Sequence, residues 1–124
     1  MFQQLFGSQR RSPGATARAK VPTISAKALA ERLGTDKSPL VVDVRTPYEY
    51  EHDGHIAGSR LLPLASLGQR LTELPRDREI VCACRSGSRP EVACELLQAR
   101  GFDNVTNLSG GMIGWRLAGL PVHG

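Results

Sequence analysis

The chain has 124 residues, of which 40% are hydrophobic, so it is long enough for one domain with a substantial core and too short for two. Four of its 16 basic residues, and none of its 12 acidic residues, lie in the first 20 positions, so the formal net charge of +4 belongs to that segment. The remaining residues are neutral overall, which argues against a basic face for binding nucleic acid.

Residues 1–20 are small and polar and lack a periodic apolar pattern after Phe6, so we expect a flexible tail before a domain at 21–124. The apolar start is too short for a signal peptide, and no run in the chain approaches the roughly 20 apolar residues that cross a bilayer. Two functional alternatives stay open for the tail. Its arginines fit an organelle-targeting presequence, and its apolar residues fit a segment that docks on a partner or a membrane surface.

The chain has three cysteines, Cys82, Cys84 and Cys94, which cannot all pair internally and whose spacing is no disulfide framework. We therefore predict a reducing compartment, the cytoplasm. Cys82 and Cys84 are two residues apart, which leaves a redox or metal use open, but structural metal sites typically contain CxxC pairs with further Cys or His ligands. Core packing is the default interpretation of Cys82 and Cys94, the histidines show no ligand spacing, and no metal site is predicted.

The predicted elements alternate between strand and helix along the domain. In chain order they are an extended segment at 22–24, a helix at 25–33, a strand at 39–44, a helix at 46–52, a short strand within 58–62, a helix at 64–74, a strand at 79–83, a helix opening at 88, a strand at 104–108 and a last helix to about 117.

Several local signals support these elements. Ser25 and Thr46 are side-chain helix caps, and Pro47 suits a first helical position. The run from Pro39 to Val44 is apolar without alternation, which is typical of a strand buried on both faces of a parallel sheet. Strands and helices joined by short connections predict an α/β domain whose parallel sheet is covered by helices on both faces.

A hexapeptide, Cys84-Arg85-Ser86-Gly87-Ser88-Arg89, links the strand at 79–83 to the next helix. Ser88 and Glu91 have the spacing of a capping box, and Pro90 fits the first helical turn. The loop is therefore short, and it places a thiol between the end of a strand and the start of a helix. In parallel sheets, ligands bind at this carboxyl edge of the strands.

The composition of this loop favours a thiolate at Cys84. Amides of a tight loop and of a first helical turn carry partial positive charge, and two arginines add to it. The serines are small enough to let amides face inward, and the glycine permits unusual backbone angles. The candidate anion-binding residues are Arg85, Ser86, Gly87, Ser88 and Arg89. The alternative, an inert buried cysteine, would not explain these neighbours.

Three separated stretches together resemble a single-domain rhodanese, a sulfurtransferase, over residues of about 22–122. They are VVDVRTPYEYEHDGHIAGS at 41–59, CRSGSR at 84–89 and LSGGMIGWRLAGLPV at 108–122. Their order and spacing make the resemblance specific, and residues 1–20 lie outside it. The resemblance implies a rhodanese-like α/β fold with a central parallel sheet of about five strands.

In that family the loop cysteine attacks the outer sulfur of a donor such as thiosulfate, forms a persulfide and releases sulfite. A thiophilic acceptor then removes the sulfur: cyanide in assays, a small thiol or a protein cysteine in cells. For this chain the resemblance implies that Cys84 is the nucleophile and that no metal or organic cofactor takes part. The residues agree with this, because a thiolate nucleophile needs no separate base and inward-facing amides can hold a persulfide anion.

Asp43 and Arg45 end the buried strand at 39–44 and are expected at the same edge as Cys84. They could form a local ion pair, or they could pair and brace the catalytic loop. The family pattern favours the bracing role for both residues.

The length of the loop distinguishes sulfur transfer from phosphate chemistry. Phosphate-ester and arsenate enzymes that resemble rhodaneses place an arginine after five intervening residues, whereas here Arg89 follows Cys84 after four. The shorter loop favours a persulfide over a phosphoryl group, so we expect negligible phosphatase activity. Two other functions stay open: a protein sulfur carrier or persulfide relay that acts on a partner, and a noncatalytic binding domain, against which the retained Cys84 argues.

Overall fold

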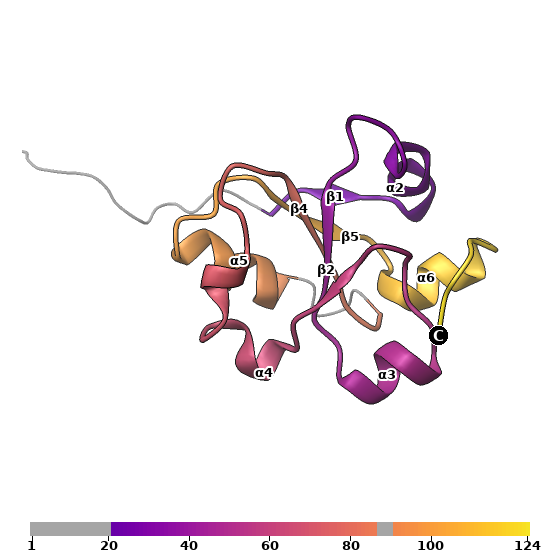
Figure 1. The fold of residues 1–124 in the computed structure, drawn as a ribbon. Helices are drawn as coiled ribbons and strands as arrows, with labels where there is room; N and C mark the ends of the chain where they lie inside the picture. The colour runs from indigo at the N-terminus through magenta and orange to yellow at the C-terminus, as the bar shows by residue number, and fades with distance from the viewer. Residues whose placement is uncertain (1–20, 87–90) are drawn as a thin grey trace, which may run out of the picture.

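The computed structural model describes residues 21–86 and 91–124, and these contain a parallel sheet of five strands in the order β1-β5-β4-β2-β3. The strands are β1 (Thr23–Ile24), β2 (Leu40–Asp43), β3 (Arg60–Leu61), β4 (Ile80–Ala83) and β5 (Val105–Leu108). The helices are α2 (Ala26–Arg32), α3 (Pro47–His52), α4 (Leu64–Leu67), the 3-10 turn η1 (Leu71–Glu73), α5 (Glu91–Ala99) and α6 (Gly111–Leu117). The predicted α/β class and parallel sheet are confirmed (Figure 1).

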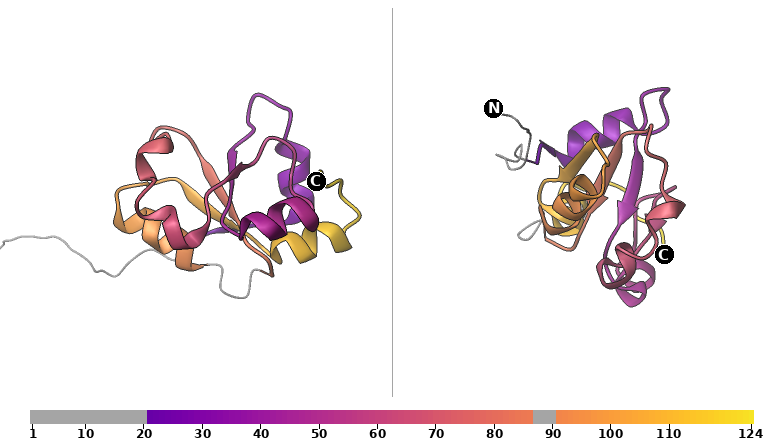
Figure 2. Two further views of the ribbon diagram at one scale, coloured as in Figure 1. Left: turned by 60° about the horizontal axis from the view of Figure 1, so that its bottom comes forward. Right: turned by 90° about the vertical axis from the view of Figure 1, so that its left-hand side faces the viewer.

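Helices cover both faces of the sheet because successive strand residues point to opposite sides. One buried cluster, on the side of α4 and α5, includes Val42, Cys82, Leu67, Leu97 and Phe102. The other cluster, on the side of α2 and α6, includes Val41, Val81, Leu29, Met112 and Trp115. The two groups of helices lie on opposite sides of the strands in Figure 1 and in the left view of Figure 2. Both-sided burial also explains why β2 and β4 are apolar without alternation.

The predicted helix caps are present. The Ser25 hydroxyl accepts a hydrogen bond from the Ala28 amide at 3.1 Å and begins α2. Thr46 begins α3 with both bonds of a capping box, in which Glu49 is the reciprocal partner, and Pro47 is the first helical residue. These short-range signals were readable because each cap satisfies amides within one helical turn.

The single helix predicted for 64–74 is wrong. The structure has one short helix, α4, which ends at Leu67, and the separate 3-10 turn η1. Gly68 follows α4 directly, and glycine in a helix interior costs about 1 kcal/mol relative to alanine, which favours an interruption there. Leu67 and Leu74 are still buried in the core, so a short helix and a 3-10 turn bury leucines whose spacing suggested one helix.

The ends of β2 and β4 lie side by side at the carboxyl edge of the sheet. Asp43 pairs in register with Ala83, and the amide of Val44 donates to the Ala83 carbonyl oxygen at 2.9 Å. The residues that follow these strands, including Arg45 and Cys84, are therefore brought together by sheet pairing. This shared edge is the one expected from the sequence, because Arg45 and Cys84 follow the ends of buried parallel strands.

Some of the predictions from the sequence concern residues 1–20 and 87–90, which the structure does not describe. The basic tail at 1–20, and the caps proposed at Ser88 and Pro90, lie outside the described residues. The helix that follows the loop is described from Glu91, and Gly101 adopts a positive φ of 93° just after it, as its predicted exit. Within 21–86 and 91–124, no helix has the length and apolar character needed to cross a membrane.

Candidate active site

Cys84 directly follows the last residue of β4 and is partly exposed at the carboxyl edge of the sheet. It borders a cavity of about 220 Å³. The described residues that line this cavity are Val44, Arg45, Glu49, Leu64, Cys82, Cys84, Arg85, Ser86, Ala93 and Asn107. The strand therefore places Cys84 at the border between a core cluster and a cavity.

The predicted loop residues are only partly described. Arg85 and Ser86 are exposed and line the cavity beside Cys84. Gly87, Ser88 and Arg89 lie outside the described residues. The amide cradle proposed for positions 85–89 therefore stays a prediction.

The start of α6 holds the backbone of the loop. The Met112 amide donates to the Cys84 carbonyl oxygen at 2.8 Å, and the Ile113 amide donates to the Arg85 carbonyl oxygen at 2.9 Å. These amides belong to the first turn of a helix, where no intrahelical acceptor is available. The carbonyl groups of Cys84 and Arg85 are thus tied to the first turn of α6.

Gly111 makes this close approach possible. A Cβ atom on Gly111 would lie 2.6 Å from the Cys84 carbonyl oxygen and 2.8 Å from that of Arg85, and its φ is +58°. Both the space and the backbone conformation require glycine here. Sequence reasoning missed this role of Gly111; the pair Gly110-Gly111 before the last predicted helix was the available signal.

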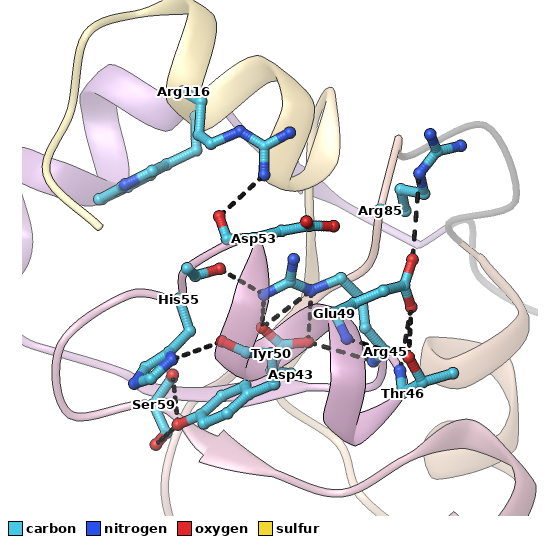
Figure 3. A network of polar contacts seen from close by, with 12 residues as sticks. Asp43, Arg45, Thr46, Glu49, Tyr50, Asp53, His55, Ser59, Arg85 and Arg116 are labelled. Carbon is cyan, nitrogen blue, oxygen red and sulfur yellow. Dashed lines mark hydrogen bonds and ion pairs between the residues drawn. The ribbon is translucent and has the colours of Figure 1, made fainter. Parts of the chain in front are cut away.

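Asp43 and Arg45 form a buried ion pair with two-point geometry (Figure 3). Arg45 Nε donates to Asp43 Oδ1 at 2.9 Å, and one terminal Arg45 nitrogen donates to Asp43 Oδ2 at 2.8 Å. The same nitrogen donates to the Gly54 carbonyl oxygen at 2.8 Å. The pair therefore fixes the turn after α3 and places Arg45 on the cavity wall, while its proposed bracing of the catalytic loop stays a prediction.

Glu49 is a cavity residue that sequence reasoning missed. Its Oε1 accepts bonds from the Thr46 amide at 3.0 Å and the Thr46 hydroxyl at 3.1 Å. Its Oε2 lies 3.9 Å from Arg85 Nε, across from the loop (Figure 3). The capping-box spacing of Thr46 and Glu49 was visible in the sequence and predicts the bonds between these two residues. It does not predict that Glu49 also faces Arg85, which follows β4.

Cys82 lies two residues before Cys84 and is buried. A hydrogen bond with Cys94, burial, and the charges of Cys94 and Cys84 raise the pKa of the Cys82 thiol well above its ordinary value. Cys82 is therefore held as a neutral thiol, as a core residue would be. Asn107, opposite Cys82 on β5, is also buried, and its Oδ1 has no hydrogen-bond partner among the described residues.

The close spacing of Cys82 and Cys84 left metal binding open as an alternative. Within the described ranges, no group of three or more His, Cys, Asp or Glu side chains is arranged to hold a metal ion. Cys82, on β4, and Cys94, on α5, instead belong to the core cluster between that strand and that helix. Their predicted packing role is thus the arrangement that the structure has.

The fold and the cavity define an α/β domain that presents one partly exposed thiol at the end of a central strand. The family model for the rhodanese-like domain matches residues 25–118, and the chain belongs to that family. The resemblance predicted from the three motifs is confirmed.

Relatives and solved structures agree with this assignment. A protein of Allochromatium vinosum named sulfurtransferase is 40% identical over 102 residues, which cover 82% of this chain and 94% of that protein. YrkF of Bacillus subtilis, named a putative sulfur carrier protein, is 35% identical over 88% of this chain and 57% of its own length. The crystal structure of a rhodanese-related protein from Thermoplasma volcanium has 34% identity and a TM-score of 0.73, covering 82% of this chain and 96% of that one.

Proposed function

We propose that this protein is a sulfurtransferase that carries a sulfane sulfur on Cys84. The observation that supports this most directly is the position of the Cys84 thiol, which borders a cavity at the carboxyl edge of the sheet beside Arg85. Membership of the rhodanese-like family, and relatives named as a sulfurtransferase and a putative sulfur carrier, support the same chemistry. The expected donor is thiosulfate or a persulfide.

The proposed reaction has two displacement steps. The Cys84 thiolate attacks the outer sulfur of thiosulfate, the sulfur–sulfur bond of the donor breaks, and sulfite leaves with the electron pair. A thiophilic acceptor then attacks the terminal sulfur of the Cys84 persulfide, and the electron pair of that bond returns to Cys84. The first step takes Cys84 from the thiolate to the persulfide level and the second returns it to the thiolate, so the complete cycle needs no external oxidant or reductant.

The surroundings of Cys84 suit these steps. The first-turn amides of α6 hold the loop carbonyls, so the thiol is carried on a braced backbone. Arg85 supplies positive charge at the cavity, where a donor or persulfide anion would be stabilised. The amides expected to face the sulfur from positions 85–89 complete the proposal.

A second candidate function is a protein sulfur carrier that passes sulfur to a partner's cysteine. The Glu49 carboxylate beside Arg85 favours it, because this acid offsets part of the positive charge that would attract thiosulfate, a dianion. In that case thiosulfate is only a surrogate donor. A very high KM for thiosulfate together with rapid transfer from a persulfidated partner would favour the carrier.

Intact-mass measurement tests the proposal. After incubation with thiosulfate or a persulfide donor and removal of excess reagent, the protein should gain the mass of one sulfur atom, and added cyanide should remove it. Cys84→Ser should abolish both the gain and the turnover, because no other described thiol is partly exposed at the cavity edge.

Cys82→Ser and Cys94→Ser are the matched controls, since each removes one thiol from the same region, and both should keep most of the activity. Equal losses in all three variants would contradict a single nucleophile and point to a multi-thiol site.

A further inference from the structure

The charged groups around the cavity are nearly balanced among the described residues. Arg45 is neutralised by Asp43, and both side chains are almost completely buried, at 2% and 1% exposure. Arg85 is 71% exposed, and the carboxylate that faces it belongs to Glu49. An acid therefore stands at the mouth of a cavity whose expected substrates include anions.

Glu49 is held in this position by its own helix. Both bonds to Thr46 fix Oε1 within the capping box, and the side chain is only 25% exposed. The other carboxylate oxygen, Oε2, is left to face Arg85 (Figure 3). The two hydrogen bonds hold the Glu49 side chain beside the cavity whether or not the exposed Arg85 side chain pairs with it.

We propose that Glu49 selects the sulfur acceptor by charge, favouring thiols that carry a cationic group next to the sulfur and disfavouring anionic ones. This inference rests on the proposed function of Cys84. The acceptor thiolate must approach the terminal sulfur of the persulfide from the cavity, so its neighbouring substituent meets the Glu49 carboxylate. The substrate class is therefore an aminothiol, or a protein cysteine flanked by lysine or arginine.

The transfer step itself is unchanged. The acceptor sulfur forms a bond to the terminal sulfur, the bond between that sulfur and Cys84 breaks, and the electron pair goes to Cys84. Glu49 takes no proton and forms no covalent bond. It acts only through the electrostatic energy of the approaching substituent, so its influence should weaken as added salt screens it.

Three thiols of matched size test the proposal: cysteamine, 2-mercaptoethanol and 3-mercaptopropionate, whose substituents are cationic, neutral and anionic. Protein loaded with one sulfur from inorganic polysulfide is mixed with each thiol, and the loss of that sulfur is followed by intact mass. The rate for Glu49→Gln is divided by the rate for the unmodified protein with the same thiol. The intrinsic reactivity of each thiol cancels in this ratio.

At low salt, this ratio should be roughly one third for cysteamine, near one for 2-mercaptoethanol and roughly three for 3-mercaptopropionate. Changes of this size are expected when one charge a few ångströms away is removed from a site that contains water. Glutamine keeps the capping box, so α3 should stay folded. Glu51→Gln is the matched control, because Glu51 is exposed on the same helix and is absent from the described cavity lining. Its three ratios should be equal.

Equal ratios for the three thiols in Glu49→Gln would overturn the charge inference and leave the proposed function standing. Failure of the unmodified protein to take up sulfur at Cys84 from either thiosulfate or polysulfide would overturn both. Should Glu49→Gln fold poorly, salt provides the second test on the unmodified protein. Added salt should slow transfer to cysteamine and speed transfer to 3-mercaptopropionate, and the same salt response for both thiols would count against Glu49.

Discussion

The interior of the sheet and its carboxyl edge expose two cysteines to different degrees, although the two are only two residues apart and line the same cavity. Cys82 lies within β4, is buried and has its thiol pKa raised, chiefly by the hydrogen bond with Cys94. Cys84 lies one residue beyond the strand and borders the cavity. The side chains start on the same face of the sheet, so residue type and facing do not distinguish them. The end of strand pairing does, because the chain leaves the core there.

The same contrast applies to charge. Asp43, the last residue of β2, is almost completely buried, and Arg45 pairs with it. Glu49 is at the edge and is partly solvated, so it can interact with whatever enters the cavity. Buried polar groups of this domain thus hold structure, while those at the edge are available to a substrate.

The largest effect should come from breaking the interior pair. Asp43→Asn leaves the buried Arg45 charge without its anion, and removing one partner of such a pair typically costs 3–5 kcal/mol, so we expect a loss of about that size in the free energy of unfolding. Urea unfolding measures it. Glu73→Gln removes an acid from the exposed pair with Arg70 and should change little. Equal costs for the two variants would contradict the contrast between interior and surface pairs.

The next effect concerns the edge. Gly111→Ala should lower sulfur transfer by about 10²-fold, because its Cβ would push against the carbonyl groups of Cys84 and Arg85 and displace the thiol. The rate of persulfide formation measures this. Gly119→Ala is the matched control, since Gly119 also has a positive φ, of +76°, but nothing within 4 Å of an added Cβ. It should lose stability through backbone strain while keeping its activity, and a comparable loss of activity in both would argue against the contact with the loop.

The smallest effect is the pH dependence of the interior thiol. Folding holds the Cys82 pKa above its unfolded value, so above about pH 8.5 the unfolded chain releases a proton that the folded protein keeps. The free energy of unfolding should therefore fall as pH rises, with Cys82 contributing up to about 1.4 kcal/mol per pH unit until the folded pKa is reached. Urea unfolding between about pH 7 and pH 10 measures this slope. Cys82→Ala should show a shallower fall, and an unchanged slope would exclude Cys82 as its source.

The amino-acid sequence alone determined the elements whose signals are local. The caps at Ser25 and Thr46, the buried strands β2 and β4, and the parallel α/β class all follow from residue types within a few positions of each other. The three motifs likewise placed the chain in its family before any contact was known. The leucine spacing at 64–74 predicted one continuous helix, but in the structure α4 ends before Gly68.

Tertiary structure alone decided how closely distant groups approach the loop that carries Cys84. The pairing of β2 with β4 brings Arg45 beside the loop, α3 turns Glu49 toward Arg85, and α6 approaches so closely that Gly111 can have no side chain. Each contact joins residues separated by dozens of positions. It forms because the helices must pack against both faces of one sheet to bury its apolar residues, and this packing fixes where each helix lies. Local propensity does not encode where the helices return, which is why the contacts of Glu49 and Gly111 with the Cys84 loop could not be predicted from the sequence.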